Sequence, residues 1–104
     1  MALTIAFKET VLARLERDPE FAVAMLREGI DALLNGEPEI GREMLRDYIN
    51  AVIGFGKLSK KVGIPPKSLM RMFSPKGNPS SSNLLSVIWA LKSDAGIDLH
   101  VAAE

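Results

Sequence analysis

Apolar side chains recur every three or four residues along most of this chain, which is the spacing of one face of an α-helix. In the first half, the breaks in this pattern predict three helices, over residues 7–17, 19–34 and 38–52. Asp18 followed by Pro19 is typical of a helix start, and Asn35-Gly36 is typical of a helix end.

The second half predicts shorter helices, over residues 57–62, 66–73 and 82–93, with a turn at 74–79 that is rich in proline and glycine. Ser80, Ser81 and Ser82 are the candidate caps of the last of these helices. The expected fold class is therefore all-α.

The last residues follow a different pattern, because Ile97, Leu99 and Val101 alternate with polar residues. A period of two predicts a short C-terminal strand. A lone strand needs a partner, and the candidates are residues 3–6 or the same strand of a second subunit.

Residues 57–73 have the pattern of two short helices joined by a tight turn, which is the helix-turn-helix unit. Gly63 stands where the turn needs a positive φ, and Ser59 stands where the two helices cross and a small side chain is needed. The internal apolar positions are Leu58, Val62, Ile64, Leu69 and Met72. A plain structural hairpin shares part of this pattern, so both interpretations stay open at this point.

Charge is unevenly distributed although the whole chain is neutral. Residues 1–54 carry six bases and ten acids, whereas residues 55–104 carry seven bases and three acids. No acid interrupts the six bases between Lys57 and Lys76. This asymmetry is consistent with a second half that faces a polyanion, and equally with a chance distribution of charge on a solvated surface.

The polar positions of the second short helix are suited to DNA. With Leu69 and Met72 buried, Lys67, Ser68 and Arg71 point outward, where such a helix reads base edges in the major groove. Met70 would contact a thymine methyl group or a protein, or would be an ordinary surface or half-buried methionine. The predicted phosphate contacts come from one face of the first short helix, from the turn and from the start of the last helix: Lys57, Lys60, Lys61, Lys76, Asn78, Ser81 and Ser82.

The segment from residue 48 to residue 91 resembles the lambda-repressor-like, Xre-type helix-turn-helix regulators, and within them the HigA-like antitoxins of the addiction-module antidote family. The resemblance is carried by the helix-turn-helix together with the following SPKGNPSSSNLL, and the opening MALTIAFKETVLARLERDPEF is similar to the start of such chains. By motif position, Lys67, Ser68 and Arg71 correspond to the family's recognition-helix contacts. Pro65-Pro66 departs from the family, since many relatives have a capping Ser or Thr there, and this puts the fine placement of the recognition helix in doubt.

The resemblance implies a lambda-repressor-like bundle in which residues 1–40 form an N-terminal helical extension and residues 41–104 form the DNA-binding region of one compact domain. It also implies a homodimeric transcriptional repressor that binds its own operator in double-stranded DNA. Its further partner would be a RelE-like toxin, as in a type II toxin-antitoxin module.

Other kinds of chemistry find little support in the residue types. There is no cysteine, and His100 is the only histidine, so we expect no metal site and no cofactor. Glu39, Glu43 and Asp47 share a helix face, but no nucleophile accompanies them, so we read an acidic surface and not an enzyme. No apolar run approaches the ~18 residues of a membrane span, and no signal peptide is present, so the expected location is the cytoplasm. The alternative function is a helical protein-interaction module that does not bind DNA.

Overall fold

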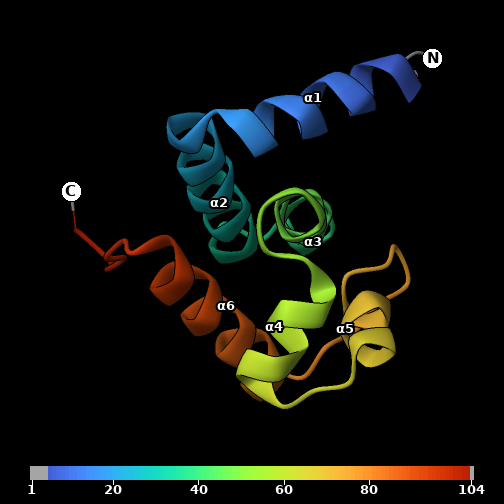
Figure 1. Cartoon of the computed structure of the whole chain (residues 1–104). Helices are drawn as coiled ribbons and strands as arrows, with labels where there is room; N and C mark the ends of the chain where they lie inside the picture. Colours follow the sequence, from blue (N-terminus) through green and yellow to red (C-terminus); the bar gives the residue numbers. More distant parts are fainter. Residues whose placement is uncertain (1–4, 104) are drawn as a thin grey trace.

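The computed structural model describes residues 5–103, with side chains from residue 10 onward, and this part of the chain is helical throughout its regular structure (Figure 1). The helices are α1 (Ile5–Arg17), α2 (Pro19–Leu34), α3 (Pro38–Tyr48), α4 (Phe55–Val62), α5 (Pro66–Met72) and α6 (Ser81–Ala95), and a π-helical segment, η1 (Ile49–Ile53), follows α3. The expected all-α class is confirmed. The prolines at the predicted starts of α2, α3 and α5 each occupy the first helical position, where the missing N–H costs nothing.

Helices α2 and α3 cross at a pair of buried glycines. A Cβ atom on Gly41 would lie 2.8 Å from the carbonyl oxygen of Gly29 and 2.7 Å from Cγ of Leu33, which is closer than such atoms approach in proteins. The two backbones are therefore close enough that only hydrogen fits between them. Helix α1 lies against α2, α3 and η1 and buries Leu15.

One cluster of buried apolar side chains joins all the helices of the described chain. It includes Leu15, Leu26, Leu45, Ile49, Leu58, Leu69 and Leu91. Figure 1 shows α1 and α2 at the top and left, α3 end-on near the middle, and α4 below it, with α4 packed against both α5 and α6. The division expected after residue 40 falls inside α3.

The third predicted helix does not continue as a regular α-helix to residue 52. After Tyr48 the chain widens into the π-helical segment, and the N–H of Gly54 donates to the carbonyl oxygen of Ile49 at 2.6 Å. Gly54 has a φ of 82°, a conformation that L side chains rarely adopt, and it turns the chain into α4. The sequence placed this break correctly and missed the wider turn that precedes it.

The predicted C-terminal strand is wrong, because residues 97–103 have no regular secondary structure. Gly96 ends α6 in the left-handed conformation, and the N–H of Ile97 donates to the carbonyl oxygen of Lys92. Ile97 and Leu99 then pack half-buried against the core, whereas Val101 is 87% exposed. The alternation therefore reflects an extended chain that packs one side on helices. Residues 5 and 6, part of the expected partner strand, belong to α1, and residues 3 and 4 lie outside the described residues.

We predict opposite effects for the same substitution at two glycines. Gly41→Ala should lower the free energy of unfolding by about 1–3 kcal/mol, because the methyl group forces α2 and α3 apart. Gly56→Ala, in α4, meets no atom within 4 Å and should be neutral or raise it by up to ~1 kcal/mol through reduced chain entropy. Urea unfolding of both variants checks this, and equal effects would contradict the close crossing.

Candidate nucleic-acid interface

Helices α4 and α5 are joined by a turn of three residues that is held by the chain itself. Gly63 adopts a left-handed φ of 72°, and its N–H donates to the carbonyl oxygen of Ser59 at 2.8 Å. The hydroxyl of Ser59 donates to the carbonyl oxygen of Ile64 at 2.6 Å. Ser59 therefore supplies a side-chain hydrogen bond across the turn.

The inner sides of α4 and α5 form the contact that the sequence predicted. Leu58 and Leu69 are completely buried and Met72 nearly so, while Val62 and Ile64 are half-buried against the core. With these side chains fixed inward, the rotation of α5 about its own axis is fixed too.

The outer side of α5 carries the predicted base-contacting residues. Lys67 and Arg71 are exposed, and neither makes an ion pair with another residue that the structure describes. Ser68 is half-buried at the margin of this side, and Met70 is 50% exposed. Pro65 caps the helix without a side-chain hydrogen bond, as expected from its residue type. Two cations that pair with no described residue therefore project from a helix whose opposite side packs in the core.

The loop after α5 is folded tightly onto the end of that helix. The hydroxyl of Ser74 donates to the carbonyl oxygen of Arg71 at 2.7 Å, and the N–H of Gly77 donates to the carbonyl oxygen of Ser74 at 2.9 Å. A Cβ atom on Gly77 would collide with the carbonyl oxygens of Arg71 and Met72. Lys76 and Asn78 are thus exposed on a well-defined loop beside α5.

Two more of the predicted phosphate-contacting residues, Ser81 and Ser82, lie at the start of α6. The cap is Ser80, whose hydroxyl oxygen accepts from the N–H of Asn83 at 3.1 Å, and not Ser81 or Ser82. Ser81 and Ser82 are exposed in the first helical turn. Their hydroxyls are therefore not needed for capping.

Two of the three lysines predicted on one face of α4 form ion pairs with an acid that the sequence did not predict there. Asp94, near the end of α6, has its Oδ1 atom 3.3 Å from Nζ of Lys57 and 3.9 Å from Nζ of Lys61. Lys60 is exposed and forms no ion pair within the described part of the chain. No local spacing could reveal this contact, because Asp94 reaches α4 only through the packing of α6.

Asp94 also affects a buried phenol. Burial of Tyr48 raises the pKa of its hydroxyl above the ordinary value, and the negative charge of Asp94 raises this pKa further. Both effects disfavour the phenolate. Tyr48 therefore stays neutral in the folded chain at pH values where a free tyrosine begins to ionise.

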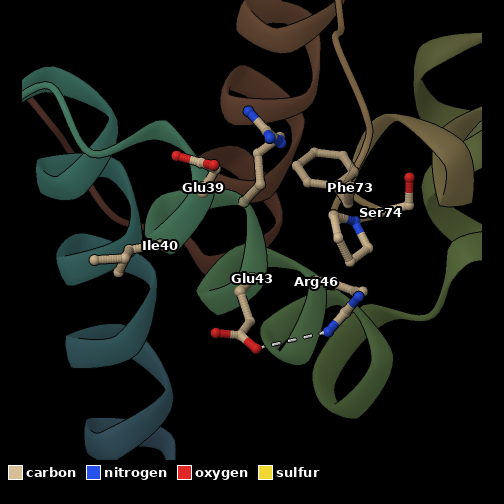
Figure 2. Close-up of a pocket in the computed structure, with 8 residues that line it drawn as sticks. Glu39, Ile40, Glu43, Arg46, Phe73 and Ser74 are labelled. Carbon is tan, nitrogen blue, oxygen red and sulfur yellow. Dashed lines mark ion pairs between the residues drawn. The ribbon is translucent and has the colours of Figure 1, made fainter.

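A hollow of about 240 Å³ lies between α3 and the loop after α5 (Figure 2). Phe73 and Ser74 face it from the loop, and Glu39, Glu43 and Arg46 face it from α3. Arg46 pairs with Glu43 at 3.9 Å. Arg42 also lines the hollow, so two acids and two bases face it and it has no excess positive charge for a phosphate.

Two other searches of the described residues give negative findings. No three histidine, aspartate or glutamate side chains in this part of the chain are placed to hold a metal ion. None of its helices is both long enough and apolar enough to cross a membrane.

The chain matches no protein-family model, no curated protein and no solved structure. The argument for function therefore depends on the geometry of α4, α5 and the start of α6.

The single tyrosine makes its ionisation easy to follow. Because folding raises its pKa, the proton is held more tightly in the folded state, so stability from this group is complete below a pH of about 10 and declines as the pH rises through the folded pKa. We expect the phenolate absorbance to appear at higher pH in the folded chain than in the urea-unfolded chain. Asp94→Asn should move this midpoint part of the way back. Identical midpoints in the folded and unfolded chains would contradict the assignment.

Proposed function

We propose that this chain is a sequence-specific DNA-binding repressor in which α4 and α5 form a lambda-repressor-like helix-turn-helix. The observation that carries the proposal is the outer side of α5, where Lys67 and Arg71 are exposed and unpaired by described residues while Leu69 opposite them is buried. A helix presented in this way can enter the major groove. Arg71 then donates two hydrogen bonds to guanine, and Lys67 and Ser68 contact neighbouring bases.

The phosphate contacts divide into two groups in this proposal. Lys76 and Asn78 lie on the loop that folds onto the end of the recognition helix, and Ser81 and Ser82 are exposed in the first turn of α6. Lys60 forms no ion pair with a described residue. In this proposal these residues position the duplex. Lys57 and Lys61 contribute less, because Asp94 already neutralises part of their charge. Asp94 lies 13 residues beyond Ser81, or about 20 Å along α6. Its negative charge therefore reduces the attraction of Lys57 and Lys61 for phosphate but lies too far away to repel a phosphate bound at the start of α6.

We predict that Arg71→Ala weakens binding to the chain's own upstream DNA by about 5- to 150-fold, which corresponds to the ~1–3 kcal/mol of one bidentate base contact. The matched control is Arg27→Ala, because Arg27 is also an exposed arginine but lies on α2. Fluorescence anisotropy over a salt series gives the affinity and the number of phosphate contacts. Lys60→Ala should lower the salt slope by about 1, and Lys57→Ala by less. Equal losses for the two arginine variants would refute the recognition-helix assignment.

We further propose that the repressor is the antitoxin of a type II toxin-antitoxin module and acts in the cytoplasm as a homodimer. The family resemblance suggests this role, and the charge distribution supports it. Exposed acids of α2 and α3, such as Glu28, Asp31 and Glu39, lie in the half of the chain with excess negative charge. An acidic surface complements a basic protein such as a RelE-like toxin.

Co-expression with the protein of the neighbouring reading frame tests the antitoxin role. We expect that protein alone to arrest growth and this chain to restore it. Arg71→Ala should still restore growth while it relieves repression, because the acidic helices and α5 are separate surfaces. A neighbour that is harmless alone, or toxicity that this chain fails to relieve, would exclude an antitoxin role without affecting DNA binding.

A second candidate function is a helical protein-interaction module without DNA affinity, which the pairing of Lys57 and Lys61 with Asp94 favours. The same salt series separates the two, since a module of this kind would show no steep, salt-dependent binding to DNA.

A further inference from the structure

The outer side of α5 carries apolar as well as charged side chains. Pro66 and Met70 are both exposed and stand one helical turn apart. Lys67 and Arg71 each follow one of them by a single residue and form a second, parallel pair. Because Leu69 is completely buried, α5 cannot rotate to hide the apolar pair from solvent. Pro66 and Met70 therefore form an apolar row beside the two cations.

The start of α5 has no hydrogen-bond donor in its two prolines. Pro65 is the cap and Pro66 is the first helical residue, and a proline has neither a backbone N–H nor a polar side chain. Both prolines are exposed. In a helix-turn-helix, the first residues of the second helix contact base edges. At this point the side chains can therefore make apolar contacts but can donate no hydrogen bond.

The surroundings of the apolar row restrict what it can contact. Lys67 and Arg71 pair with no described residue, and no acid occurs between Lys57 and Lys76. A partner must therefore present negative charge and an apolar group together. In the major groove of DNA, thymine presents its 5-methyl group among the base edges, and the phosphate backbones border the groove. An RNA helix is a poor match, because uracil lacks this methyl group and the major groove of RNA is too deep and narrow for side chains.

We infer that the apolar row contacts thymine methyl groups, so that this chain selects duplexes in which thymine lies close to the guanine contacted by Arg71. The inference rests on the proposed function, because it names what the same side of α5 reads. Pro66 and Met70 lie about 6 Å apart along the helix, which is less than two base-pair steps of ~3.4 Å. Both can therefore meet methyl groups within one short run of base pairs, and the unbranched side chain of Met70 adapts to the position of such a group.

Deoxyuridine tests this contact, because it pairs as thymidine does and lacks only the 5-methyl group. The probe is the chain's own upstream DNA as a synthetic duplex, made either with thymine or with uracil in its place. We expect the thymine duplex to bind more tightly by about 4-fold for each methyl group contacted, or about 15-fold for two, as for the burial of one or two CH₂-sized groups. Fluorescence anisotropy at one salt concentration measures both affinities.

Two substitutions remove the apolar row without changing the charge. Met70→Gln keeps the length of the side chain and should reduce the thymine preference to about 4-fold, and the double variant Pro66→Ser, Met70→Gln should bring it close to equality. The matched control is Leu34→Gln, because Leu34 is 69% exposed at the end of α2 and should keep the full preference. Circular dichroism verifies that the variants are folded.

Two results would overturn the inference and leave the repressor proposal intact. Equal affinity of the unchanged chain for the thymine and uracil duplexes would mean that no methyl group is contacted. A thymine preference that the double variant keeps would come from the shape of the duplex or from other side chains. A chain that binds neither duplex at any salt concentration would refute the repressor proposal itself, and the inference with it.

Discussion

The rotation of α5 is the constraint on which the proposed interface depends. Leu58 and Leu69 are completely buried between α4 and α5, and the hydrogen bond from Ser59 to the carbonyl oxygen of Ile64 holds the turn between them. A helix of seven residues has little stability of its own. Its orientation therefore comes from these contacts, and the exposure of Lys67 and Arg71 is their direct consequence.

Two glycines allow segments of the backbone to pack against each other more closely than any other residue would. Gly41 allows α2 and α3 to approach each other, and Gly77 allows the loop after α5 to lie on the last carbonyl groups of that helix. In both places a side chain would need space that the neighbouring backbone occupies. The two acidic helices are thus held close to each other, and the basic loop is held against the end of α5.

Packing also changes which of the basic side chains are available to bind a polyanion. The six bases from Lys57 to Lys76 are adjacent in sequence without an intervening acid. In the folded chain Asp94 lies against Lys57 and Lys61, so the basic surface is concentrated on α5, the following loop and Lys60. Helix α6 consequently contributes differently along its length, with exposed serines at its start, an apolar face in the middle and an acid near its end.

The sequence by itself determined the helices, their proline and glycine boundaries, and the inward and outward sides of α5, because these follow from local spacing and from the backbone preferences of single residues. It misassigned the tail, since Ile97 and Leu99 alternate for packing on helices and not for pairing with a strand. It also could not reveal the ion pairs of Asp94, the π-helical turn after Tyr48 or the exposure of Trp89. The ion pairs and the exposure of Trp89 were decided by the tertiary structure alone, because each depends on which distant segment lies beside the residue and not on its neighbours in the chain.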